Sequence, residues 1–317
     1  METDRHPSQR FSPVFIWGEP ASHHTGAAAR WWLHHSLLAL QRRLATTGSR
    51  LIIRQGEAGN VLTALAAEGG ASAVWWNHRI DPDATRRART ARDALALRGI
   101  ATQVFDADLL HDPETIRGGR PYQVFTAFWR ASLRAPPPPP PRPPPRHLPP
   151  VPTRIRSVAV ESLALLPTVP WDAGLSETWR PGERSAGQRL RDFCRAGLAH
   201  YAERRDLPAI DGTSKLSPHL RFGELSPRQV AHAVRTTVEG GHPPNVHAGA
   251  EAFLRQLYWR EFAYHLLHHH PASRDRPLDR RFESFPWRED RDALVAWQRG
   301  ETGIPLVDAG MRELWQT

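Results

Sequence analysis

The chain has 317 residues, 40% of them apolar, and a formal net charge of +9. That length accommodates two domains, each with a core of its own. No apolar run approaches the ~20 residues that span a bilayer, and the N-terminus lacks the apolar stretch of a signal peptide. We therefore expect a soluble, cytoplasmic, monomeric protein without a membrane partner. The single cysteine, Cys194, excludes an intramolecular disulfide.

Nearly all the cationic residues are arginine, whose planar donor fork suits phosphate groups and thus nucleic acid. Arginine usage of this kind also accompanies GC-rich coding, so the charge alone leaves the partner open. The chain holds 12 tryptophans, a number that core packing alone explains less easily. Indole rings also stack on bases and relay electrons.

The first third of the chain alternates short apolar runs with longer amphipathic ones, a pattern typical of α/β folds. We expect this region to form a doubly wound parallel sheet. Two tryptophan pairs, Trp31–Trp32 and Trp75–Trp76, are interpreted as core residues. The expected buried strands cover residues 14–17, 50–54, 73–76 and 102–105, and the expected helices cover 26–46, 58–68 and 83–97.

A proline-rich segment at residues 135–152 cannot form a helix or a sheet ladder, because proline lacks the backbone donor. A polyproline II linker is the preferred interpretation, and a docking site for a proline-reading module is the minor alternative. The predicted organisation is an α/β domain over 11–134, a linker over 135–177 and a helical domain over 178–317. Within the last domain, helices are expected at 185–201, 226–238, 248–269, 290–299 and 305–315.

Residues 212–229 combine a glycine, several hydroxyls and the only lysine of the chain at one helix start. Gly212 would let backbone amides approach an anion, and the hydroxyls of Thr213, Ser214 and Ser217 would surround it beside Lys215. A pyrophosphate suits this place. The alternative is structural: Ser217–Pro218 and Ser226–Pro227 would simply be helix N-caps followed by proline.

The expected helix at 248–269 carries an unusual mixture of groups. An aromatic ring, an amide, an indole and a guanidinium recur at i, i+3, i+6 and i+7, at Phe253, Gln256, Trp259 and Arg260. Such a face suits unpaired bases.

Four histidines follow on the same helix, namely His265, His268, His269 and His270. No His-Glu-x-x-His arrangement accompanies them. We interpret them as a helix C-terminus favoured by the dipole, and expect no metal.

Four segments together resemble the DNA photolyase and cryptochrome family. The run at 212–229 resembles its flavin-binding signature, and the other three segments follow the family's order at 119–129, 253–262 and 285–311. The resemblance implies an α/β domain followed by an all-α flavin-binding domain. Within the family, the sequence most resembles a class I photolyase that acts on cyclobutane pyrimidine dimers.

The resemblance also assigns roles to single residues. FAD would be held by Tyr201, Thr213, Ser214, Lys215, Leu216, Ser217, Phe253 and Arg260. DNA containing pyrimidine dimers would contact Arg205 through a phosphate, Gln256 through base edges, Trp259 by stacking, and Arg260. Many relatives place glutamate where Gln256 stands, which leaves the lesion type open between cyclobutane dimers and 6-4 products.

Three further residues receive weaker assignments from the resemblance. Trp287 and Trp297 would transfer electrons to the flavin. Asn77 falls where the family binds an antenna chromophore, either a folate or a deazaflavin. The residues after Asn77 differ from the family's usual sequence at this place. Whether this pocket is filled is not readable from the sequence.

The family's first strand and its last helices have no counterpart in the sequence, so we expect a fragment, truncated at both ends. The expected function of the parent protein is light-driven repair of pyrimidine dimers by electron transfer from reduced FAD. Two alternatives stay open. One is a cryptochrome-like blue-light photoreceptor, and the other is an inactive truncated remnant.

Overall fold

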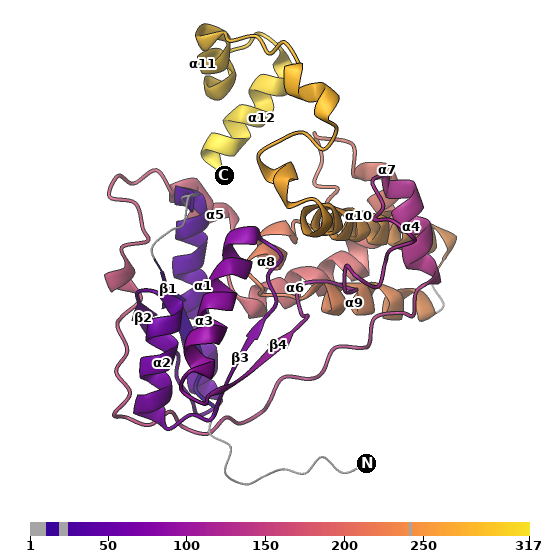
Figure 1. Ribbon diagram of the computed structural model, residues 1–317. Coiled ribbons are helices and arrows are strands. Elements are labelled where there is room, and N and C mark those ends of the chain that lie inside the picture. Colours follow the sequence, from indigo (N-terminus) through magenta and orange to yellow (C-terminus); the bar gives the residue numbers. More distant parts are fainter. Residues whose placement is uncertain (1–10, 19–24, 241–242) are drawn as a thin grey trace.

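The computed structural model describes residues 11–18, 25–240 and 243–317. The α/β part forms around four short parallel strands (Figure 1). The strands β1 (Val14–Trp17) and β2 (Ile52–Gln55) pair with each other, as do β3 (Ala73–Asn77) and β4 (Ala101–Phe105). The helices between them are α1 (Ala27–Thr46), α2 (Ala58–Gly69) and α3 (Pro82–Ala96).

This arrangement confirms the predicted alternation of strands and helices, and the predicted parallel pairing. The described strands form two separate pairs, however, and not one continuous sheet. Full burial of all four strands was wrong, because only β2 contains fully buried residues, Ile52 and Ile53. Trp31 and Trp32 lie in the core as predicted, whereas Trp75 is 44% exposed and contacts Phe105 edge to face.

The segment predicted as a linker is partly a structural element of the α/β part. After the prolines, the chain runs along the free side of β2, where Val158 N donates to Ile53 O and Ser157 Oγ accepts from Ile53 N. Val151 and Ile155 are buried against Ile52 in a small cluster of their own. The segment therefore covers an exposed strand edge, which would otherwise be free to pair with another chain.

The rest of the described chain is helical. Its principal helices are α4 (Phe125–Arg134), α5 (Ala173–Thr178), α6 (Glu183–Asp192), α7 (Tyr201–Arg204), α8 (Ser217–Arg221), α9 (Pro227–Glu239), α10 (Pro244–His269), α11 (Arg291–Arg299) and α12 (Pro305–Gln316). Between α6 and α7 the chain continues as a π turn, Phe193–Gly197, and a 3₁₀ turn, Leu198–His200, so the single helix expected at 185–201 is divided.

The packing divides the chain differently from the predicted boundary at residue 134. Leu110, Ile116, Phe125 and Phe128 are buried in the same core as the helices α6, α9 and α10. The chain thus enters the helical part soon after β4, and α4 belongs to that part. The proline tract then leads back to the α/β part, where it passes beneath the strands (Figure 1).

The helix α10 lies at the centre of the helical part (Figure 1). Gly249 makes its position feasible, because a Cβ there would lie 1.7 Å from Leu198 O. A buried hydrogen bond between the two parts of the chain is supplied by α1, where Trp32 Nε1 donates to Glu224 Oε1 at 3.1 Å. The helices α11 and α12 lie to one side of the molecule (Figure 1), and the end of α12 returns to the segment after α5, where Trp179 Nε1 donates to Thr317 O at 2.9 Å.

Candidate functional site

A small polar group lies where α7 ends beside α10. The guanidinium of Arg205 is 5.6 Å from the centre of the Tyr201 ring. In the amide orientation that satisfies both groups, Gln256 Oε1 accepts from Arg205 Nη1 at 2.5 Å. Burial raises the pKa of the Tyr201 hydroxyl, an effect that the nearby Arg205 charge opposes. The structure therefore brings together three predicted residues from two segments of the chain.

The Trp259 indole lies one helical turn further along α10, and it is 45% exposed. It stacks on Phe125 of α4 with ring centres 3.7 Å apart and an angle of 8° between the rings. Phe262 contacts it edge to face at 5.9 Å. One side of an indole is thus held in a fixed orientation while much of its surface stays open, which is what stacking on a planar ligand requires.

The side chains of Phe253 and Arg260 have surroundings that differ from those of Gln256 and Trp259. Phe253 is buried in the helical core against Phe193 and Tyr201. Arg260 Nη1 donates to Asp108 O at 2.7 Å, toward the chain that follows β4. The four residues predicted as one face of the helix are therefore divided: Gln256 contacts Arg205, and Trp259 lies one turn further along against Phe125.

The predicted diphosphate segment has hydroxyls available, but its helix is short. Thr213 and Ser217 are exposed, and Ser214 Oγ accepts from Leu216 N at 3.4 Å, while the Leu216 side chain is buried in the helical core. Lys215 adopts a left-handed backbone with φ of 51° and pairs with Asp211 at 3.2 Å. The helix α8 has five residues, so its dipole is weak.

The structural alternative for this region is half correct. Ser226 is a true N-cap, since its hydroxyl accepts from Gln229 N and the Gln229 side chain accepts from Ser226 N. Ser217 is the first residue of α8 and makes no capping bond. Gly212 has a packing role that the sequence did not indicate, because a Cβ there would lie 2.3 Å from Arg204 O.

The predicted electron-transfer tryptophans are at the surface. Trp287 is 81% exposed and contacts Phe285, and Trp297 on α11 is 48% exposed. Within the described residues, no ring contact or hydrogen bond joins either indole to Tyr201 or Gln256. Their role stays a prediction.

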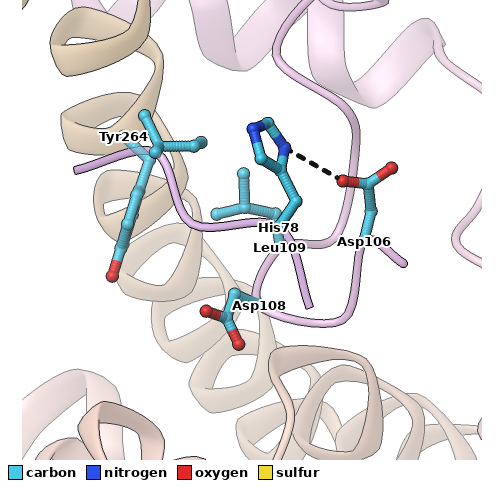
Figure 2. Close-up of a pocket in the computed structure, with 6 residues that line it drawn as sticks. His78, Asp106, Asp108, Leu109 and Tyr264 are labelled. Atoms are coloured by element: carbon cyan, nitrogen blue, oxygen red, sulfur yellow. Dashed lines mark hydrogen bonds and ion pairs between the residues drawn. The ribbon is translucent and has the colours of Figure 1, made fainter. Parts of the chain in front are cut away.

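Asn77, the predicted antenna residue, is exposed at the end of β3, and the residue after it, His78, lines a small cavity (Figure 2). The cavity lies at the carboxyl ends of β3 and β4, where His78 Nδ1 and Asp106 Oδ1 are 3.3 Å apart (Figure 2). Tyr264 of α10 closes the opposite side (Figure 2). Its lining residues are His78, Ile80, Asp106, Asp108, Leu109 and Tyr264. The carboxyl edge of a parallel sheet is where open α/β folds bind ligands.

Two buried carboxylates that the sequence did not single out join segments that are distant along the chain. Glu261 of α10 is 4% exposed and accepts from Leu110 N and His111 N, at 2.9 and 3.3 Å. Glu224 is also buried, and it accepts from Trp32 Nε1 and from Gly182 N. Each makes contacts more than 40 residues away along the chain, so no local pattern could have found them.

The fold and the site together define a class of protein. In this class an α/β part is joined to a helical part, and the helical part presents an amide, a guanidinium and an open indole. The sequence profile of DNA photolyase matches residues 4–145, and that of the FAD binding domain of DNA photolyase matches residues 253–317. The chain belongs to the DNA photolyase and cryptochrome family.

Individual relatives agree with this assignment. The chain is 40% identical over 307 residues to a deoxyribodipyrimidine photo-lyase of Agrobacterium fabrum, covering 96% of this chain and 63% of the relative. It is 36% identical over 319 residues to cryptochrome-1 of Arabidopsis thaliana, covering 96% of this chain and 46% of the relative. The chain thus spans less than two thirds of the length of these relatives.

A solved structure of a bacterial class III photolyase from Agrobacterium tumefaciens superposes with a TM-score of 0.91 at 39% identity, covering 98% of this chain and 64% of that one. An archaeal photolyase from Sulfolobus tokodaii with two FAD molecules superposes with a TM-score of 0.77 at 26% identity, covering 97% and 65%. The first of these is described as class III and not as the class I that we expected. We therefore assign the family without a subclass.

Proposed function

We propose that this chain carries the lesion-recognition face and part of the flavin site of a light-driven deoxyribodipyrimidine photolyase. The observation that carries the proposal is the pairing of an open, stacked indole with an amide held by a guanidinium, one helical turn apart on α10. Trp259 would stack on an extruded base, and Gln256 would donate and accept hydrogen bonds at its edge. Arg205, a quarter exposed, would contact the DNA backbone.

The residues fit FAD in part. The free hydroxyls of Thr213 and Ser217, with Lys215 between them, form a donor set suited to a diphosphate. Tyr201 would contribute to the proposed flavin site on the side of Gln256, because the Arg205 guanidinium contacts both residues. When bound in reduced form, FAD supplies the electron that opens the cyclobutane ring after excitation by light. The protein's own part is to hold the lesion beside the flavin and to keep water out.

A cryptochrome-like photoreceptor is the second candidate. It is favoured by one observation, the neutral amide of Gln256 where many repair enzymes carry a carboxylic acid. An amide keeps the hydrogen-bonding shape but cannot donate a proton to the opening ring. A photoreceptor would use the same flavin without binding lesions selectively, so DNA binding separates the two candidates.

The test compares binding to a duplex with one thymine dimer and to the same duplex without damage. Trp259→Ala should weaken binding of the damaged duplex by about 1–3 kcal/mol and leave the undamaged one nearly unchanged. Trp75→Ala is the matched control, because Trp75 is equally exposed but lies on the α/β part. If the wild-type chain does not prefer the damaged duplex, or if both variants behave alike, lesion recognition by Trp259 is refuted.

The arginine is tested by salt dependence. Arg205→Ala should weaken binding of both duplexes equally and lower the slope of log K against log salt by about one unit, as loss of one phosphate contact does. Arg195, exposed and paired with Asp192, provides the control variant Arg195→Ala. An unchanged slope in Arg205→Ala would remove Arg205 from the DNA contact.

A further inference from the structure

The histidines at the end of α10 lie beside a carboxylate from a distant segment. Glu114, in the loop after β4, and His268 approach within 2.8 Å between Oε1 and Nε2. The ligand atoms of Glu114, His268 and His269 all lie within 4.8 Å of one another. This group could not be recognised from the sequence, because Glu114 and His268 are 154 positions apart.

We propose that Glu114, His268 and His269 form a binding site for a divalent transition metal ion, with Zn²⁺ as its occupant. Two imidazoles and one carboxylate are a donor set that Zn²⁺ uses, with water completing the coordination. Donor atoms around Zn²⁺ at bond lengths of about 2.0–2.2 Å lie roughly 3.3 Å apart in a tetrahedron. The separations present, all within 4.8 Å, exceed that spacing by at most about 1.5 Å.

The surroundings of the three residues favour this geometry. The second oxygen of Glu114, Oε2, lies 3.2 Å from Arg117 Nη1, so it stays engaged while Oε1 faces the histidines. Such outer partners orient a metal ligand. The His269 ring is fixed on its other side by His265, whose ring centre is 4.5 Å away. His268 and His269 are half-buried, so they are accessible to an ion from solvent.

The alternative is a plain ion pair between Glu114 and a protonated His268. That pair would be exposed and would stabilise the fold little. It also gives no role to His269, whose Nε2 makes only a long contact of 3.4 Å with Pro113 O. A metal ion would use all three groups and would fasten the loop after β4 to the end of α10.

The test uses the 1–317 chain purified without a histidine tag and stripped with EDTA. We expect it to bind one equivalent of Co²⁺ with the visible absorption of a low-coordinate site, and Zn²⁺ to displace the Co²⁺. Glu114→Gln and His268→Ala should each weaken Zn²⁺ binding by more than the roughly 10- to 100-fold that loss of an outer partner costs. Zn²⁺ should raise the Tm of the wild-type chain and not that of Glu114→Gln.

The control variant His232→Ala, His247→Ala removes two exposed histidines on α9 and α10 that lie outside the group. It should bind Zn²⁺ as the wild type does, which shows that binding does not depend on the histidine content of the chain. Glu114→Gln replaces an exposed side chain, so the variant should fold, and its far-UV circular dichroism checks this. Absence of saturable Zn²⁺ binding, or unchanged affinity in folded Glu114→Gln, would overturn the proposal.

Discussion

Replacing Glu261 by glutamine should make the stability of the protein less sensitive to a rise in pH from 5 to 8. Glu261 lies inside the molecule, where its Oε2 accepts from Leu110 N while Oε1 has no hydrogen-bond partner within the described residues. Burial raises the pKa of this carboxyl to about 8, although two backbone amides and the Arg260 charge act in the opposite direction. The folded state therefore favours the protonated acid.

The sign of the effect follows from this raised pKa. The protonated Glu261 carboxyl contributes to the free energy of unfolding. This contribution is fully present below the ordinary pKa of 4.5 and is lost as the pH rises through about 8. One pKa unit corresponds to about 1.4 kcal/mol, so the wild type should lose about 2–4 kcal/mol relative to Glu261→Gln between pH 5 and pH 8. Glutamine keeps an oxygen for the Leu110 amide and carries no charge to bury.

The assay is urea unfolding followed by tryptophan fluorescence at pH 5, 6.5 and 8, on the wild type, Glu261→Gln and Glu251→Gln. Glu251 is exposed on the same helix, so its replacement controls for the removal of one negative charge. We expect the stability difference between Glu261→Gln and wild type to grow with pH, and that for Glu251→Gln to stay constant. Parallel pH dependences for the wild type and Glu261→Gln would refute the reasoning.

Three further substitutions and one control substitution test how the fold is held together, each measured by thermal and urea unfolding. Ile155→Ala should cost about 2–4 kcal/mol because its side chain is buried under β2, and a loss below half a kcal/mol would show that the segment is only a linker. Ser226→Ala should cost about 1 kcal/mol by removing the N-cap of α9, whereas Ser217→Ala, which removes no cap, should be nearly neutral. Gly249→Ala should prevent α10 from packing, because its Cβ would collide with Leu198 O, and a normally folded variant would contradict this.

Local pattern predicted most of the helices and the parallel strand pairs, because periodicity of apolar residues decides which face of an element is buried. It predicted the strand burial poorly. Trp75 and Phe105 are strong strand formers whose side chains pack against each other at the surface, so their residue types give no indication of which layer covers them.

The residues of the candidate site were proposed from the sequence, but the sequence did not predict how their side chains are arranged. Spacing on one helix placed Arg260 beside Gln256 and Trp259, whereas the Arg260 guanidinium donates to a backbone carbonyl, Asp108 O. That acceptor is 152 residues away in the sequence. The sequence did not indicate Glu114 for the same reason. Contacts between distant segments depend on tertiary packing, which the periodicity of a sequence does not encode.

The uninterrupted length of α10 has a mechanical consequence. Its 26 residues form a rod of about 39 Å, with the predicted base-reading groups near its middle and the contacts to residues 110–122 on its far side. A stiff rod transmits a small rotation along its whole length. A substitution in the loop after β4 should therefore change the orientation of Trp259 without touching it, and mutational scans that examine only the surface around Trp259 would miss such residues.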